Sequence, residues 1–369
     1  MKILYILDYI PLGTRAFDDY LETFMAAVRA RGWELRFVFA GEPSASASET
    51  LRDQQVPWTV LSFPVSWSFR RDIKRSWPDY RPDLVYTSFL SVFTMPLVIA
   101  RWQGWMRSWV VSDESSGAPA KGRFCKRVLR SIRGRAVGRV VDGVRAVSHY
   151  IAQRDIELMA LPKSKVHAVW NGINEARYPF RPYKPDHEEL RILYIGQLIS
   201  EKGVHVLIDA LCGLRNSGGC FVCRIAGDGK SREALEAQVQ KSDLASHVAF
   251  NGFCSDPVSQ YHWADVVVIP SIWAEAFGLV AIEAMATGAI VVVSDAGGLP
   301  EVVGDAGIVV PAGNCSELDA ALTALVKSPE RWSDMKVAAR RRVEECFSVD
   351  HSVASILDLF ASVTNTVRN

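Results

Sequence analysis

Two glutamates eight positions apart, Glu275 and Glu283, frame the part of the sequence best suited to chemistry. Between them, Phe277-Gly278-Leu279 opens an apolar stretch that predicts a helix over 279–287. The start of a helix presents unpaired N–H groups and partial positive charge, which suit a diphosphate, and glycine lets a ligand approach the backbone closely. Glu275 could then accept hydrogen bonds from sugar hydroxyls, while Glu283, about one turn inside the helix, could reach a ribose. Taken alone, the pair is more typical of two solvated surface glutamates.

Glycine-rich loops elsewhere in the same half of the chain support the first interpretation. The loop Gly196-Gln197-Leu198-Ile199-Ser200-Glu201-Lys202-Gly203 follows an apolar run, and Ala226-Gly227-Asp228-Gly229 ends the next one. Ligands of open parallel sheets bind outside the carboxyl ends of the strands, where these loops are expected to lie. Lys202 would supply a mobile positive charge to a leaving phosphate.

The elements that must position these loops alternate between strand and helix. Residues 2–9, 17–31 and 34–39 predict a strand–helix–strand unit, followed by strands at 56–61, 84–87, 109–112 and 143–147. The Ser/Ala-rich stretch 43–49 is interpreted as a loop. Pro179, Pro182 and Pro185 indicate a linker, after which alternation resumes with strands at 191–196, 221–226, 248–251, 266–270 and 289–294 and helices at 203–214, 231–241 and 279–287.

This pattern predicts an α/β protein with two Rossmann-like domains whose parallel sheets face a central cleft. We expect the domains at 1–180 and 181–348, with a last helix in 349–369 that packs back on the N-terminal domain. A length of 369 residues, 49% hydrophobic and 22% charged, fits two globular domains. The seven cysteines show no paired framework, and Cys220 and Cys223 lack partners for zinc, so we expect a reducing, cytoplasmic location and no metal.

Charge differs sharply between the two halves. Residues 1–169 hold 25 Lys/Arg against 16 Asp/Glu, and the basic excess is concentrated between Arg70 and Arg145. Such a surface suits an anionic partner. The apolar segment 89–100, followed by Trp102, Trp105 and Trp109 at helical spacing, is too short to span a membrane and predicts a core helix. The alternative is an interfacial helix on anionic lipid, which would make the protein peripheral at the inner face of the membrane.

With these motifs in order, the chain resembles the family 4 glycosyltransferases, retaining enzymes of the GT-B architecture. Glu275 and Glu283 match the E-x7-E motif, Asn171-Gly172-Ile173 matches NG[VI], Lys202 matches the phosphate loop, and 297–301 matches GGxPE. The resemblance implies that Lys202 and the amides near Gly278 hold the donor phosphates, with Glu283 on the ribose and Glu275 on the transferred sugar. The residues expected to bind the donor are Gly13, Gln197, Lys202, Gly227, Glu275, Phe277, Gly278, Leu279 and Glu283.

Three positions depart from the family pattern. Gln197 stands where many members have arginine, so stabilisation of the leaving group would depend more heavily on Lys202. Gly13 is followed by Thr14 where the family often has a second glycine. Val110-Val111-Ser112-Asp113-Glu114 lacks the usual histidine, so Asp113 either takes the place of that catalytic group or caps a loop.

The resemblance therefore implies transfer of a sugar from a UDP- or GDP-sugar to a hydroxyl of a glycan or lipid-linked acceptor, in synthesis of cell-surface polysaccharide or glycoconjugate. Glu275, Lys202 and Asp113 are the expected catalytic residues, and no cofactor or metal is expected beyond the nucleotide-sugar substrate. The alternatives are a nucleotide-sugar-binding subunit with reduced catalysis, and another GT-B enzyme such as a nucleotide-sugar epimerase. A nucleic-acid partner is not expected, because the arginines come without a recognisable binding module.

Overall fold

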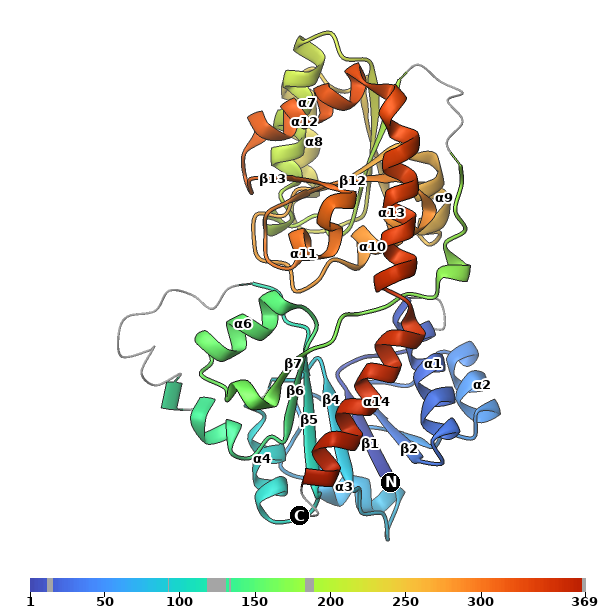
Figure 1. The fold of residues 1–369 in the computed structure, drawn as a ribbon, viewed down its shortest axis with the longest axis vertical. Coiled ribbons are helices and arrows are strands. Elements are labelled where there is room, and N and C mark those ends of the chain that lie inside the picture. Colours follow the sequence, from blue (N-terminus) through green and yellow to red (C-terminus); the bar gives the residue numbers. More distant parts are fainter. Residues whose placement is uncertain (12–15, 92, 118–130, 133, 183–188, 367–369) are drawn as a thin grey trace. The chain divides into compact units, whose positions relative to one another are not determined.

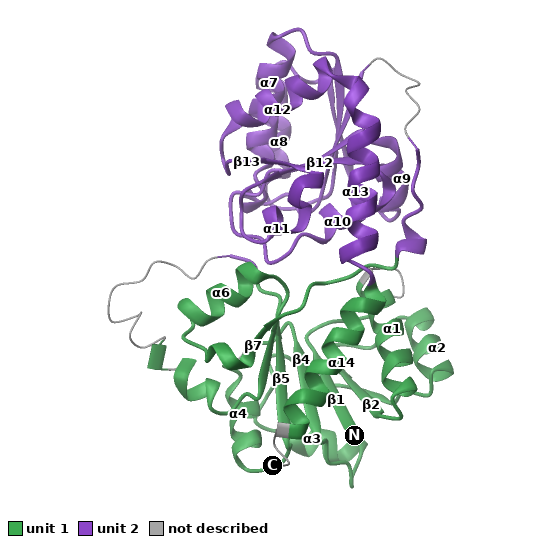
Figure 2. Cartoon of the chain, in the orientation of Figure 1, with its two compact units in different colours: residues 1–115, 119–174, 349–369 green, residues 116–118, 175–348 purple. Residues whose placement is uncertain are grey.

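The computed structural model describes residues 1–11, 16–91, 93–117, 131–132, 134–182 and 189–366. The chain divides into two compact units (Figure 2). Unit 1 comprises residues 1–115, 119–174 and 349–369, and unit 2 comprises residues 116–118 and 175–348. Each unit is an α/β layer structure around a parallel sheet, which confirms the predicted fold class.

Unit 1 contains a seven-stranded parallel sheet with the order β3-β2-β1-β4-β5-β6-β7. The order reverses between β1 and β4, which creates a switch point at the carboxyl edge. The strands are β1 (Lys2–Leu7), β2 (Glu34–Phe39), β3 (Trp58–Val60), β4 (Leu84–Ser88), β5 (Ser108–Asp113), β6 (Gly143–Ala146) and β7 (Val166–Ala168).

Helices cover both faces of this sheet because β1 is apolar on both sides. Ile3, Tyr5 and Leu7 pack under α1 (Ala16–Ala30) and the C-terminal helix α14 (Val349–Thr366). Leu4 and Ile6 point the other way, toward α3 (Phe69–Ser76) and α4 (Met95–Trp102). Figure 1 shows α14 lying along the sheet of unit 1 close to α1. Unit 1 also contains the helices α2 (Ala45–Asp53) and α6 (His149–Glu157).

Unit 2 contains a six-stranded parallel sheet with the order β10-β9-β8-β11-β12-β13. One face packs under α7, α8 and α12, and the other carries α9, α10 and α13. The strands are β8 (Leu190–Ile195), β9 (Phe221–Ala226), β10 (Val248–Gly252), β11 (Val266–Ile269), β12 (Ile290–Ser294) and β13 (Ile308–Val310). The helices are α7 (Val204–Asn216), α8 (Arg232–Lys241), α9 (Pro257–Trp263), α10 (Leu279–Thr287), α11 (Leu299–Val303), α12 (Cys315–Lys327) and α13 (Trp332–Cys346).

Two local predictions are wrong. The stretch 43–49 is not a loop, because residues 45–49 form the start of α2. Ser44 caps this helix by accepting a hydrogen bond from the Ala47 amide, and the helix buries Ala47 and Leu51. The three tryptophans do not share a helical face, because α4 ends at Trp102 and Trp109 lies buried on β5. The sequence analysis also did not identify the closing elements of unit 2, from α11 to α13.

Candidate functional site

The glycine loops of unit 2 come together at the carboxyl edge of its sheet. Gly196 follows β8, Gly227 follows β9, and Gly297 follows β12. Gly227 has φ of +145°, and a Cβ there would lie 1.8 Å from the carbonyl oxygen of Gly196. Only glycine permits this close approach of the two loops. The parallel arrangement of the strands thus brings loops that are about 30 to 100 residues apart in the chain to one edge.

Helix α10 begins at this same edge. Its N-cap is Gly278, with φ of +123° and no side-chain cap, and a Cβ there would lie 2.7 Å from Leu299 Cδ2. The first-turn N–H groups of α10 therefore donate no hydrogen bond to a capping side chain. Phe277 is buried, with its ring edge-on to Phe347 at 5.7 Å between centroids, while Leu279 is partly exposed. Leu299 and Phe347 thus pack against the start of α10, and no side chain caps its first-turn amides, which suits an anion site.

The carboxylate of Glu275 is fixed at this edge by two hydrogen bonds. Its Oε1 accepts hydrogen bonds from Lys202 Nζ at 2.7 Å and from Ser271 Oγ at 2.5 Å. Ser294 Oγ in turn donates to the Ser271 carbonyl at 2.6 Å. Lys202 lies on the 3-10 turn Ser200–Lys202, and both Ser271 and Glu275 are buried. The arrangement therefore pairs a lysine, a side chain that commonly binds phosphate, with a carboxylate in a fixed position.

Glu283 lies in the second turn of α10 and is fixed by a tyrosine from a neighbouring helix. Its Oε2 accepts a hydrogen bond from Tyr261 Oη at 2.6 Å, and Tyr178 also donates to this carboxylate. Burial raises the pKa of the Glu283 carboxyl above its ordinary range, against the lowering effect of the two tyrosine hydrogen bonds. Neither tyrosine was identified from the sequence, since nothing in the spacing of the motifs points to them.

The remaining predicted site residues are held to different degrees. Gln197 is exposed, and Tyr194 Oη donates to its carbonyl at 2.7 Å, which fixes its backbone but not its side chain. Asp113 belongs to unit 1, where its carboxylate accepts hydrogen bonds from the Ser115 amide at 2.9 Å and from Arg154 Nη2 at 2.7 Å. It therefore occupies the loop-capping position that was one of the two predictions for it. Gly13 lies outside the described residues.

Unit 1 contains a buried charged cluster at its own carboxyl edge that the sequence analysis missed. Arg145 is 1% exposed and donates to Asn171 Oδ1 at 2.6 Å and to Ser112 Oγ at 3.2 Å. Its guanidinium lies 3.5 Å from Glu114 Oε1. Burial raises the pKa of Glu114, while the Arg145 charge opposes that rise. Arg145 thus ties the Asn171-Gly172-Ile173 motif to the end of β5.

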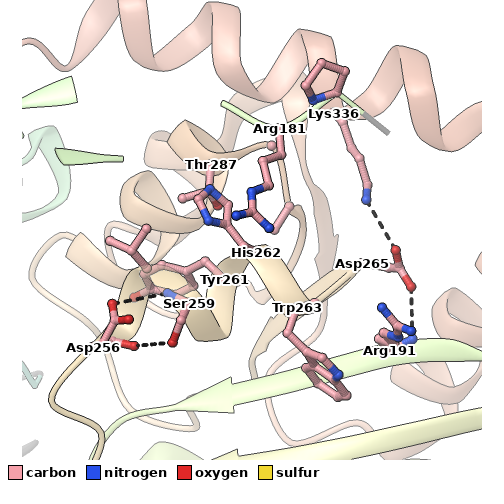
Figure 3. Close-up of a pocket in the computed structure, with 15 residues that line it drawn as sticks. Arg181, Arg191, Asp256, Ser259, Tyr261, His262, Trp263, Asp265, Thr287 and Lys336 are labelled. Carbon is pink, nitrogen blue, oxygen red and sulfur yellow. Dashed lines mark hydrogen bonds and ion pairs between the residues drawn. The ribbon is translucent and has the colours of Figure 1, made fainter. Parts of the chain in front are cut away.

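One cavity of unit 2, of about 830 Å³, lies away from these motifs, at the amino edge of the sheet (Figure 3). Within the residues that the structure describes, no three His, Cys, Asp or Glu side chains are placed to hold a metal ion. No helix among those residues is long and apolar enough to cross a membrane. The carboxyl edge of unit 2 is therefore the place where the predicted ligand-binding residues gather.

Comparison with known proteins agrees with these motifs. The family described as "Glycosyl transferases group 1" matches residues 179–342, and "Glycosyltransferase Family 4" matches residues 19–177. The glycogen synthase of Mycobacterium tuberculosis is 30% identical over 208 residues, 55% of this chain and 47% of that protein. The amylovoran biosynthesis glycosyltransferase AmsK of Erwinia amylovora is 30% identical over 122 residues, 32% of this chain and 30% of that protein. The chain thus spans less than half the length of either relative.

Solved structures match over nearly the whole chain. A glycosyltransferase from Rickettsia africae has a TM-score of 0.78 at 18% identity, covering 98% of each chain. Anabaena HepE, crystallised with UDP, has a TM-score of 0.79 at 19% identity, covering 98% of this chain and 100% of that one. These likenesses show a shared GT-B fold, and the two family matches together account for residues 19–342 apart from residue 178. The chain therefore belongs to the glycosyltransferases that these two family models describe.

Proposed function

We propose that this protein is a retaining, metal-independent glycosyltransferase that moves a sugar from a nucleoside diphosphate sugar to a hydroxyl group. The observation that carries the proposal is the cluster of Lys202, Ser271 and Glu275 at the edge where α10 begins. A cation, open helix amides and a fixed carboxylate together provide for a diphosphate and for the sugar attached to it. UDP-sugars and GDP-sugars are the donor candidates, and UDP is favoured because Anabaena HepE was crystallised with UDP and with UDP-glucose.

In this proposal unit 2 binds the donor. Lys202 and the first amides of α10, at Gly278 and Leu279, bind the diphosphate. The Glu283 carboxylate, held by Tyr261, accepts hydrogen bonds from the ribose. Glu275 accepts hydrogen bonds from hydroxyls of the transferred sugar. The backbone of the loops at Gln197 and Gly227 and the buried Phe277 shape the site.

The reaction replaces one bond at the anomeric carbon by another. The acceptor oxygen bonds to that carbon as the bond to the diphosphate oxygen breaks, and its electron pair leaves with the nucleoside diphosphate. The acceptor proton passes to the departing diphosphate. Because Gln197 has no charge, Lys202 and the α10 amides stabilise the negative charge that develops on the leaving group, in the role that a divalent cation has elsewhere.

Unit 1 binds the acceptor in this proposal, with Asp113 and the basic segment 70–145 near it. A glycan or lipid-linked acceptor in polysaccharide synthesis is supported by the curated relatives, which include AmsK and the putative colanic acid glycosyltransferase WcaL of Escherichia coli. A cytoplasmic protein that touches the anionic inner face of the membrane would meet such an acceptor. Sedimentation with anionic vesicles at low salt tests the membrane part, and absence of binding contradicts it.

A nucleotide-sugar-binding subunit without turnover is the second candidate, and the exposed Gln197 in place of arginine is the observation that favours it. A thermal-shift panel of UDP, GDP, ADP and CMP followed by assays of sugar transfer separates the two. At a concentration of 100 Kd, a nucleotide stabilises its unit by about 2.7 kcal/mol, which corresponds to roughly 5–10 °C. If one nucleotide raises the melting temperature and Lys202→Ala reduces this rise, the result supports the donor site. Transfer to an acceptor supports the enzyme, and binding without transfer to any acceptor supports the subunit.

A further inference from the structure

The cavity of unit 2 lies at the opposite edge of the sheet from Glu275. It is lined by Arg191 at the start of β8, by α9, by the last turn of α10 and by Lys336 of α13, and its volume is about 830 Å³ (Figure 3). Pockets that bind small molecules typically have volumes of about 300–1,000 Å³. None of the E-x7-E, GGxPE or phosphate-loop residues lines it. A ligand in this cavity would therefore not compete directly with the donor.

The charged side chains of the lining are mostly cationic. Arg181, Arg191 and Lys336 line the cavity together with His262, against the acidic residues Asp256 and Asp265. Both carboxylates already accept hydrogen bonds within the fold. Asp256 caps α9 by accepting from the Ser259 amide at 3.2 Å, whereas buried Asp265 accepts from the Arg191 amide at 3.1 Å and from Lys336 Nζ at 3.3 Å.

Arg181 is the cation that the fold leaves available. Its amide donates to the Thr287 carbonyl at 3.1 Å, which fixes its backbone at the rim of the cavity. Its side chain is exposed, and its guanidinium has no acceptor or carboxylate partner among the described residues. An arginine whose backbone is fixed and whose guanidinium lines a cavity is suited to bidentate recognition of an anion.

The cations near the cavity also repel one another. The Arg224 guanidinium lies over the ring of Trp263, a lining residue, at 3.8 Å from its centroid. Desolvation and the nearby Arg191 charge both lower the pKa of Arg224. A negative ligand beside Arg191 would relieve this repulsion, whereas a metal cation would increase it.

We propose that this cavity binds a small organic phosphate, a phosphate monoester carried on a compact polar or ring-shaped group. Arg181 at the rim binds the phosphate, and the indole of Trp263 with Val258 packs against the organic part. A phosphate monoester suits a lining in which three cations face two carboxylates that already accept hydrogen bonds within the fold. The size of the cavity exceeds what inorganic phosphate alone would fill.

The test is calorimetric titration of the full chain with ribose 5-phosphate, ribose and inorganic phosphate. Saturable binding of ribose 5-phosphate, with no binding of ribose and weaker binding of inorganic phosphate, is expected. Arg181→Glu should weaken the binding of ribose 5-phosphate at least about tenfold, because it removes a charge-assisted hydrogen bond and adds repulsion. Arg331→Glu, the same change at another exposed arginine of unit 2, should leave it unchanged.

Vesicles of phosphatidylcholine with and without phosphatidic acid distinguish a soluble phosphate from a lipid headgroup. Binding to phosphatidic acid that Arg181→Glu abolishes identifies the headgroup as a source, and its absence identifies a soluble ester. The proposal is wrong if neither ribose 5-phosphate nor phosphatidic acid binds the unmodified full chain, provided that a thermal melt shows this chain to be folded. Binding that Arg181→Glu leaves intact overturns it as well. Neither result depends on whether the protein transfers a sugar.

Discussion

Replacing Glu275 by glutamine is expected to tighten the binding of UDP while it abolishes sugar transfer. Lys202 Nζ lies 2.7 Å from Glu275 Oε1, so the cation that is proposed to bind the diphosphate is held by a carboxylate. Glutamine keeps the size of the side chain, and its amide oxygen can still accept from Ser271. The substitution therefore frees Lys202 and removes a negative charge that repels the diphosphate.

The exposure of the pair sets the size of the effect. The Lys202 side chain is 26% exposed and that of Glu275 is 10% exposed, between a surface pair and a buried one. A pair of this kind contributes about 1–2 kcal/mol, which corresponds to roughly 5–30-fold in UDP affinity when it is released. Loss of the proposed hydrogen bonds to the transferred sugar should lower kcat/KM about 100-fold or more.

Titration calorimetry with UDP and a transfer assay with the donor sugar measure the two effects separately. Glu201→Gln is the matched control, because Glu201 is an exposed carboxylate on the same 3-10 turn whose side chain accepts from Ser200 at 2.8 Å. It should change UDP affinity less than about twofold. Weaker UDP binding by Glu275→Gln would refute the reasoning, since Lys202 would then need the carboxylate in order to bind phosphate.

Three further predictions concern groups that the tertiary structure holds. Arg145→Met should lower the free energy of unfolding by about 3–5 kcal/mol in urea titrations, because Glu114 stays buried without its cation. Adding Glu114→Gln should restore part of the lost free energy of unfolding, and a double variant that recovers none would contradict the pairing. Burial and the charge of the neighbouring Asp113 raise the pKa of Asp155 to about 8, against the lowering effect of Arg154. Because this folded-state pKa exceeds the unfolded value near 4, stability should fall as pH rises from about 4 to 8. Thermal melts of Asp155→Asn should show a flatter profile over the same range. Tyr261→Phe should weaken UDP binding in calorimetry, because Glu283 loses the hydroxyl that fixes its carboxylate, and unchanged affinity would exclude Glu283 from the ribose site.

The sequence alone determined the strands, most helices and the order of the glycine loops. The apolar runs at 2–7, 190–195 and 266–269 are buried on both faces, and this pattern depends only on which residues are apolar. The helix predicted over 279–287 has the same bounds in the structure. Because parallel strands carry their carboxyl ends to one edge, the order of the loops was sufficient to predict where a ligand site would form.

The partners of the site residues were decided only by the tertiary structure. Ser271 lies two residues after the end of β11, and its position at the carboxyl edge was the one signal that could have drawn attention to it. Tyr261 gave no such signal, since its bond to Glu283 depends on how α9 packs against α10. The same holds for Arg145, which reaches Asn171 and Ser112 across the ends of strands far apart in the chain.

The cavity at the amino edge of unit 2 shows this division most clearly. Its lining comes from separate segments between Arg181 and Lys336, and no motif or spacing connects them. Apolar periodicity is a local property of the chain, so the sequence determined the elements and the edge at which the family motifs gather. Hydrogen bonds and cavities depend on strand register and on helix packing between distant segments, so only the folded structure decided them.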